Sequence, residues 1–242
     1  MTIELFFSNG LELLADKLSE NLVMERLSGS DLFEAPVVIV PNANLSKWLQ
    51  LTLARKDAIV MNLDFQYLES GLWQMLAELD SRMDSPERIT GDIYRILLLF
   101  TLQSLEEPQP DLLQVTEYLG DPKAPRQSDY AKRLWQLSEK LAGLFQEYEF
   151  HRIEMIQSWC ENVNIPDDLE RCQQQLYLRA KAFRDALAGV NGRLLLSITE
   201  YAADIFSAGG MAASPECHRK PVHLFGLSQI SAFHLRRIGL LR

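Results

Sequence analysis

The sequence lacks any apolar run of the roughly 18 residues that a membrane-spanning helix requires. Its start also lacks the pattern of a signal peptide, because Glu4 interrupts the first apolar run. The two absences predict a cytoplasmic location. Cysteine is scarce as well: the three thiols, Cys160, Cys172 and Cys217, have the spacing of neither a disulfide framework nor a zinc finger, and we expect buried free thiols.

A nucleotide cradle is missing where it would be expected. Residues 3–18, "IELFFSNGLELLADKL", have the pattern of a strand, a turn and a helix. A Walker A loop needs G-x-x-x-x-G-K-[ST], because its glycines and its Lys hold the phosphates. Here the turn has only residues 8–10, no Lys comes before Lys17, and Glu12 would repel a phosphate. A structural turn fits better, with Asn9 as the N-cap and Glu12 in the first helical turn.

Other catalytic signatures are missing too. An ATPase strand should end in an acid that holds Mg²⁺, but the only nearby acid, Asp64, has the position of a helix cap. The sequence has no G-x-S-x-G, no H-E-x-x-H and no compact cluster of acids with Lys. We therefore expect a non-catalytic chain that holds no metal and no cofactor of its own.

Charge limits the possible partners without excluding nucleic acid. The 242 residues carry a net charge of −9, and 47% of them are hydrophobic, as in a globular protein. DNA binding depends on Lys and Arg that neutralise phosphates, so a uniformly DNA-attracting surface is excluded and a local channel is not.

Four short apolar runs predict a mostly parallel sheet. They lie at residues 3–7, 37–40, 58–63 and 221–227, are rich in β-branched or aromatic residues, and are separated by helical patterns. Buried strands that alternate with helices are typical of an α/β fold. We expect strands from both ends of the chain to build one sheet with helices on its faces.

A long helical region separates the third run from the fourth. Amphipathic helices are predicted at 71–83, 89–105, 129–152 and 167–189, where apolar residues recur every three or four positions. One stripe of the third helix comprises Leu134, Leu137, Leu141, Leu144, Phe145 and Tyr148. We expect these helices to form an insertion. The closing "SQISAFHLRRIGLLR" begins a helix without a C-cap glycine, which favours a piece of a longer protein.

Polar and aromatic residues follow the second and third runs, at 41–50 and 64–76. Ligands of open α/β sheets gather outside the carboxyl ends of the strands. Side chains there could share one crevice and offer hydrogen bonds and stacking to unpaired bases. The candidates are Asn42, Lys47, Tyr67 and Trp73. Alternatively, Trp73, like Trp48, belongs only to the core side of a helix.

One family shares several of these blocks. Residues 37–76, with "WLQLTL", "NLDF" and a later Trp, resemble the N-terminal region of RecC, the gamma-chain family of exodeoxyribonuclease V. The similarity continues through 134–152 with Trp159 behind it, and through 222–241. Together with "SNGLELL" near the start, it covers essentially the whole chain.

The resemblance implies a fold and a role. The fold would be the RecA-like parallel sheet of a degenerate superfamily 1 helicase domain, residues 1–64 and 207–242, with an all-helical insertion at 65–206. The role would be to scaffold the beta and alpha subunits of a bacterial helicase/nuclease, split forked duplex DNA and carry a single strand past a Chi-type signal during double-strand-break repair. ATP and Mg²⁺ would belong to those partners, and no membrane would be involved.

The resemblance also implies which residues line the strand channel. They are Pro41, Asn42, Ala43, Lys47, Tyr67, Trp73, Gly143, Leu144 and Gln146. Trp73 and Leu144 keep the family's residue type, and Trp73 is the leading candidate for base stacking. The departures are Pro41 and Lys47 for amides, Tyr67 for an aliphatic residue, and Gly143 and Gln146 for acids. The familiar Chi octamer is therefore not implied.

Three hypotheses remain open from the sequence. The first is a strand-binding domain of the gamma chain. The second is a pure scaffold whose loops never touch DNA, and the third is a nucleotide-dependent enzyme that binds ATP at Ser8–Gly10.

Overall fold

The computed structural model describes residues 4–27, 35–57, 62–80, 82, 84–105, 110–121, 127–161, 163, 165–207 and 222–227. The chain divides into two compact units. We call residues 1–81 with 205–242 the α/β unit and residues 82–204 the helical unit. The unit boundaries expected from the sequence follow residues 64 and 206. The structure instead includes residues 65–81 and 205–206 in the α/β unit.

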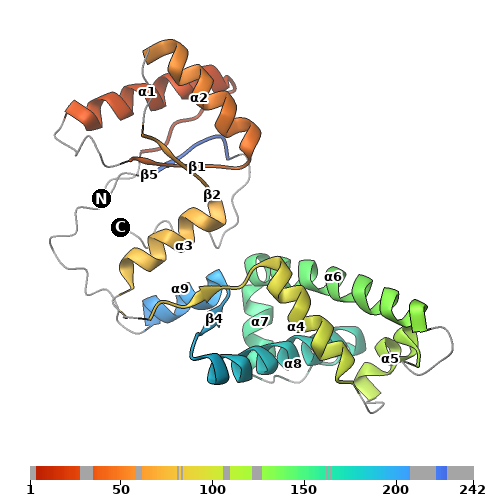
Figure 1. Ribbon diagram of the computed structural model, residues 1–242. Coiled ribbons are helices and arrows are strands. Elements are labelled where there is room, and N and C mark those ends of the chain that lie inside the picture. Colours follow the sequence, from red (N-terminus) through yellow and green to blue (C-terminus); the bar gives the residue numbers. More distant parts are fainter. Residues whose placement is uncertain are drawn as a thin grey trace. The chain divides into compact units, whose positions relative to one another are not determined.

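A three-stranded parallel sheet forms the centre of the α/β unit (Figure 1). Its order is β2 (Asp64–Tyr67), β1 (Val37–Val40), β5 (Val222–Leu224). β1 has a neighbour on both sides and is buried along its whole length, which is why it reads as an unbroken "VVIV". The expected parallel sheet, built from both ends of the chain, is confirmed.

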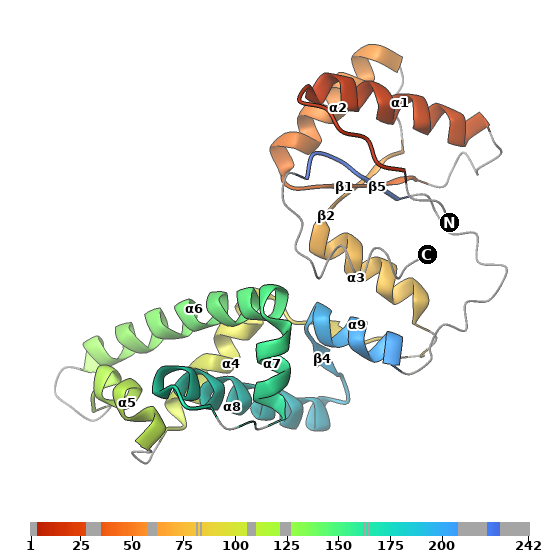
Figure 2. The same cartoon turned by 180° about the vertical axis from the view of Figure 1, so that it is seen from behind.

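Helices cover both faces of this sheet, as the two views show (Figures 1 and 2). Side chains alternate between the faces along β1. Val38 and Val40 pack into a buried cluster with one pair of helices, whereas Ile39 lies against Gly71 of the helix on the opposite face. The pair is α1 (Leu11–Leu27) and α2 (Ala43–Asp57), and the third helix is α3 (Leu68–Leu79).

Two strand predictions are wrong. Residues 4–7 of the first run form no strand, and Phe7 is 85% exposed; both sides of β1 are already taken by β2 and β5. Of the third run, residues 58–61 lie outside the described residues, and β2 begins at Asp64, just beyond the predicted range. Asn62 has a positive φ of 65°, and Asp64, expected to cap a helix, is the first residue of β2, where its N–H donates to Pro36 O at 3.0 Å.

The four amphipathic helices that the sequence predicted are all present, but with different bounds, and three of them belong to the helical unit. α3 (Leu68–Leu79) overlaps the first predicted range, 71–83, and belongs to the α/β unit; the other three are α4 (Gly91–Gln103), α6 (Gln127–His151) and α8 (Asp168–Asn191). Shorter helices join them: a 3-10 turn (Pro110–Leu112), α5 (Leu113–Leu119), α7 (Ile153–Cys160) and α9 (Ile198–Ser207). Within the described residues, no helix is long and apolar enough to cross a membrane.

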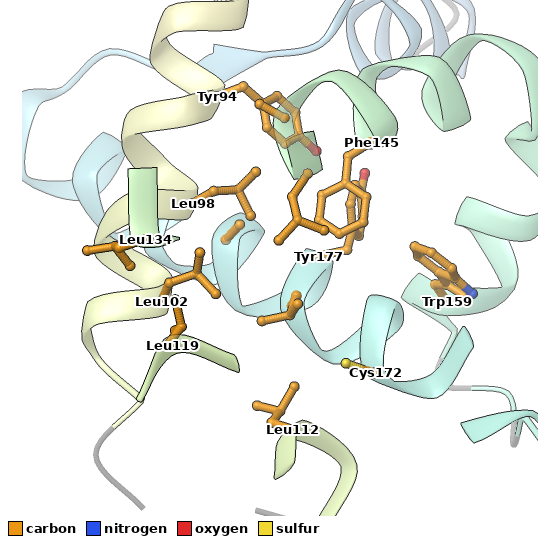
Figure 3. Packing of buried hydrophobic residues seen from close by; sticks show 14 of the residues in the cluster. Tyr94, Leu98, Leu102, Leu112, Leu119, Leu134, Phe145, Trp159, Cys172 and Tyr177 are labelled. Carbon is orange, nitrogen blue, oxygen red and sulfur yellow. The ribbon is translucent and has the colours of Figure 1, made fainter. Parts of the chain in front are cut away.

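Aromatic rings occupy the core of the helical unit (Figure 3). Phe145 of α6 is fully buried and meets Trp159 and Tyr177 edge-on, at centroid distances of 6.3 and 5.5 Å. Edge-to-face pairs of this kind add to the free energy of burial. The stripe predicted from Leu134 to Tyr148 packs into this cluster, so its assignment as a core face is confirmed.

A second, two-stranded sheet was not predicted. β3 (Glu87–Arg88) pairs in parallel with β4 (Leu195–Leu196), which joins the beginning of the helical unit to its end. The backbone bonds continue beyond the strands, with Ile89 N donating to Leu196 O at 3.0 Å. Two-residue strands are too short to show a periodic pattern, so no sequence signal was available.

The helical unit contains one buried carboxylate, Glu149, and one half-buried carboxylate, Glu200. Glu149 Oε1 accepts hydrogen bonds from the hydroxyls of Tyr94 (3.1 Å) and Tyr177 (3.2 Å), and burial together with the charge of Glu200 raises the pKa of Glu149 to about 7. For Glu200, burial would raise the pKa as well. The hydrogen bonds and charge of Arg184, reinforced by Lys181, outweigh it and lower that pKa to about 2.

Candidate functional site

The turn before α1 is not built as a phosphate cradle. Ser8 Oγ accepts the Gly10 N–H at 3.0 Å, and Gly10 O accepts from Leu14 N. Gly10 therefore stands at the helix start, and the expected N-cap role of Asn9 is wrong. Lys17 forms an ion pair with Glu20 and lies over a phenyl ring, that of Phe6, rather than over the turn. These contacts favour the structural turn over a nucleotide site.

The carboxyl ends of β1 and β2 meet at one edge of the sheet. Val40 and Tyr67 are paired in the register, so the residues that follow β1 lie beside the end of β2. Pro41, Asn42 and Ala43 are exposed there, and Tyr67 is 51% exposed. Four of the nine candidate residues thus lie together at this edge.

Asn42 has a structural task at this edge. Its Oδ1 accepts the Leu45 N–H at 2.9 Å, and its carbonyl accepts from Ser46 N at 3.2 Å, which makes Asn42 the N-cap of α2. The cap fixes the direction of the chain as it leaves β1. Asn42 therefore positions the edge as well as belonging to it.

Lys47 and Trp73 come from helices on opposite faces of the sheet. Lys47 is exposed on α2, whereas Trp73 is half-buried on α3. Tyr67 shares the α2 face, because Phe65, two residues earlier on β2, packs into the cluster with α1 and α2. The structure thus places Tyr67 and Lys47 on one face and Trp73 on the element that covers the other. Trp48 is the other tryptophan for which the sequence left a core role open. Its ring stacks on that of Phe225, with a centroid distance of 6.4 Å, beside the core.

A hollow of about 490 Å³ lies between α2 and the segment that leads into β2. Lys47 is one of its lining residues. The others are Gln50, Leu51, Ala54, Asn62, Leu63 and Phe65. Sequence reasoning missed the hollow, although Lys47, Gln50, Leu51 and Ala54 have the three- and four-residue spacing of one helix face.

Charge is unevenly distributed over the two helices that share a face of this sheet. α2 carries three basic residues, Lys47, Arg55 and Lys56, and one acid, Asp57. α1, in contrast, carries four acids and two basic residues. Lys56 Nζ lies 2.9 Å from Asp16 Oδ1 of α1, so part of the basic charge is neutralised between the helices. Of these two helices, α2 is the better suited to an anionic ligand.

The other three candidate residues lie on α6 of the helical unit. Gly143 is exposed, and nothing lies within 4 Å of where its Cβ would be. Leu144 packs against the aromatic core, and Gln146 lies against Gly91 at the start of α4. Leu144 is thus a packing residue, whereas Gly143 leaves room on the surface of α6.

The expected thiols are only partly as predicted. Cys172 is buried, but Cys160 is exposed, because it ends α7 on the surface of the helical unit. Cys217 and its neighbour His218 lie outside the described residues. His223 of β5 lies 3.1 Å from Glu25 Oε2 of α1. Across the described part of the chain, no three His, Cys, Asp or Glu side chains group as a metal site would require.

The fold and this edge define a class of protein: a small parallel α/β unit with polar and aromatic residues at its strand ends, interrupted by a large helical unit. The chain belongs to the family described as "RecC, N-terminal domain", whose model matches residues 3–241. The resemblance seen in the sequence is confirmed.

Two curated relatives are similar to the chain over most of its length. The RecBCD enzyme subunit RecC of Haemophilus influenzae is 29% identical over 175 residues, which cover 71% of this chain and 15% of the relative. The RecBCD enzyme subunit RecC of Escherichia coli is 29% identical over 157 residues, 65% of this chain and 13% of the relative. The chain therefore spans about one seventh of the length of the curated relatives it matches.

Proposed function

We propose that the chain is the N-terminal part of the non-catalytic gamma subunit of an exodeoxyribonuclease V complex, which repairs double-strand breaks by recombination. Membership of the RecC family supports this, since both relatives are named as subunits of the RecBCD enzyme. The α/β unit would be a degenerate RecA-like helicase domain. Beta and alpha subunits would supply ATP hydrolysis, Mg²⁺ and nuclease chemistry.

Within that complex, we assign single-stranded DNA binding to the sheet edge formed by Pro41, Asn42, Ala43 and Tyr67. Lys47, one helical turn into α2, belongs to the same proposed site. The observation that carries the assignment is the pairing of Val40 with Tyr67, which brings exposed polar and aromatic groups together at the carboxyl ends of two parallel strands. This is where open α/β sheets bind ligands. Tyr67 supplies a stacking surface, and Lys47 a charge for phosphate.

Trp73 is a further proposed strand-binding residue of the α/β unit, and the resemblance separately implies Gly143, Leu144 and Gln146 on α6 of the helical unit. Recognition of a Chi-type signal would depend on which bases these side chains contact. Because Pro41, Lys47, Tyr67, Gly143 and Gln146 differ in type from the family's pattern, the proposed signal differs from the familiar octamer.

The test is a salt titration of fluorescent single-stranded oligonucleotide binding by the full-length subunit in its assembled complex. Tyr67→Ala and Trp73→Ala should weaken binding at every salt concentration, since stacking on an aromatic contributes about 1–3 kcal/mol per base. Lys47→Ala should weaken binding mainly at low salt and flatten the salt dependence. Trp135→Ala, an exposed tryptophan of α6, is the matched control. Because Trp73 is half-buried, weaker binding by Trp73→Ala is evidence for a DNA contact only if the melting temperature of the variant is unchanged.

A pure scaffold is the second candidate. Exposed apolar side chains before α1 favour it: Leu5 is 70% and Phe7 85% exposed, as is typical of a surface that another protein covers. A scaffold predicts normal strand binding by the Tyr67→Ala, Trp73→Ala and Lys47→Ala variants. It also predicts weaker subunit assembly when Leu5 and Phe7 are replaced by Ser.

A further inference from the structure

We propose that the hollow beside α2 binds one unpaired nucleobase of the strand that passes the sheet edge. This inference rests on the proposed function and adds to it a base-binding pocket beyond the edge itself. The hollow's seven lining residues all come from α2 and from residues 62–65.

The lining combines the three kinds of group that a nucleotide requires. Phe65, Leu51, Leu63 and Ala54 form apolar walls that can contact the face of a base. Gln50 and Asn62 bring amide side chains, which both donate and accept hydrogen bonds as the edge of a base does. Lys47 brings an exposed cation for the phosphate of the same nucleotide.

Size and charge favour a nucleotide over other ligands. A volume of about 490 Å³ lies within the range of about 300–1,000 Å³ that small-molecule pockets occupy. The basic character of α2 in a chain of net charge −9 favours an anion. An acidic peptide would satisfy Lys47, but its carboxylates would leave the apolar walls of Leu51, Leu63 and Phe65 unused.

The position of the hollow fits a strand that has already met the sheet edge. Phe65 and Tyr67 lie on the same face of β2, and Lys47 lies one helical turn after the start of α2 at that edge. A strand that stacks on Tyr67 can therefore direct a neighbouring base toward Phe65. The two aromatic side chains would hold bases of one continuous segment.

The experiment measures binding of single-stranded oligonucleotides that carry one abasic site, moved along the strand, to the full-length subunit in its assembled complex. In the wild type, removal of one particular base should weaken binding by about five- to a hundredfold, the equivalent of losing one stacked base. Leu51→Trp fills the hollow from a position that is 61% exposed. It should weaken binding to the intact strand and abolish the effect of that abasic site.

Leu13→Trp on α1, where Leu13 is 65% exposed, is the matched control and should keep the wild-type profile. The proposal is overturned if Leu51→Trp keeps that profile, or if it weakens intact and abasic strands equally. Weaker assembly of Leu51→Trp with its partner subunits, with strand binding unchanged, would also overturn it and make the hollow a protein contact. If Tyr67→Ala and Trp73→Ala weaken strand binding in the same experiment, the proposed function survives such a result; if neither does, both proposals fall.

Discussion

The two units of this chain obtain their stability differently. The helical unit is a single continuous segment, and sixteen of its described residues form one buried cluster around Phe145. The cluster of α1, α2 and the sheet in the α/β unit has eight buried members, and one of them, Phe225, comes from beyond the helical unit in sequence. The helical unit can therefore build its core from local helices, whereas the α/β unit needs chain from both of its ends.

The difference concerns function as well as folding. The proposed strand-binding edge lies on the unit with the smaller buried cluster, at strand ends where polar groups stay exposed. The unit with the larger cluster supplies three candidate residues from one helix, α6. Because each unit has its own buried cluster, damage to one core should leave the other unit folded.

The largest expected effect is on the helical core. Trp159→Ala removes a fully buried ring that meets Phe145, Tyr148 and Tyr177, together with its Nε1–H bond to Glu170 at 3.1 Å. The free energy of unfolding of this unit should fall by about 3–5 kcal/mol. Hydrogen exchange followed peptide by peptide should show faster exchange across α4, α6 and α8, and unchanged exchange in β1.

Trp135→Ala is the control for that variant. Trp135 is 47% exposed, with the Arg95 guanidinium 4.4 Å from its ring centroid, so its loss should cost about 1 kcal/mol or less. Equal destabilisation of both units by Trp159→Ala would contradict the separation of the cores.

The buried carboxyl of Glu149 predicts a pH-dependent stability confined to the helical unit. Its pKa is raised from 4.5 to about 7, so the folded state holds this proton more tightly than the unfolded state. The stabilisation is fully present below about pH 4.5 and is lost as the pH rises through 7. Glu149→Gln keeps an oxygen for the hydroxyls of Tyr94 and Tyr177 and removes the charge, so at pH 8 it should stabilise the unit by about 1–3 kcal/mol.

Chemical denaturation between pH 5 and pH 8 would measure this effect. The wild type should lose stability across that range, and Glu149→Gln should lose less. Glu147→Gln, the same change at an exposed position on α6, should keep the wild-type slope. Glu200 does not interfere, because its pKa is about 2 and it stays ionised throughout this window. Parallel slopes for all three proteins would show that Glu149 is not the cause.

A steric test addresses the α/β unit. A Cβ on Gly71 would lie 2.5 Å from Cδ1 of the fully buried Ile39, so Gly71→Ala forces α3 away from β1. The cost should be about 1–3 kcal/mol, more than the helix propensity that alanine gains. Adding Ile39→Val removes that Cδ1 atom.

Thermal unfolding of the two single variants and the double variant should therefore be non-additive. The double variant should be more stable than the sum of the single effects predicts. Strict additivity would mean that α3 does not pack closely on β1.

The sequence predicted those parts of the fold in which several residues share one pattern. "VVIV" at 37–40 identified a buried central strand, and the stripe on α6 identified a core face. Prediction from the sequence failed where the start or the pairing of a strand depended on a single residue or a single neighbouring strand. β2 begins only after Asn62, whose φ is positive, and residues 5–7, although apolar, pair with no strand among the described residues.

The candidate site was predictable to a similar extent. Its position after a strand predicted Asn42 at the sheet edge, because the carboxyl ends of parallel strands share an edge. Tyr67, expected to follow a strand, is instead the last residue of β2. Pro41 and Ala43 were implied only by the family resemblance. The pattern could not show that Lys47 and Trp73 lie on helices covering opposite faces. It also could not show the hollow, whose walls come from two segments separated in sequence.

The smallest predicted effect concerns the β3–β4 pair that closes the helical unit. Arg193 forms an ion pair with Glu87 across this pair, but the two side chains are 74% and 48% exposed. Exposed ion pairs contribute about 0–1 kcal/mol, because water and salt screen them. The backbone hydrogen bonds from Glu87 N to Leu194 O and from Ile89 N to Leu196 O should therefore keep β3 and β4 paired without the ion pair. Arg193→Gln should change the melting temperature no more than Lys132→Gln, an exposed cation on α6, and high salt should remove any difference. A clearly larger, salt-sensitive loss for Arg193→Gln would mean that side-chain charge, not strand pairing, closes the helical unit.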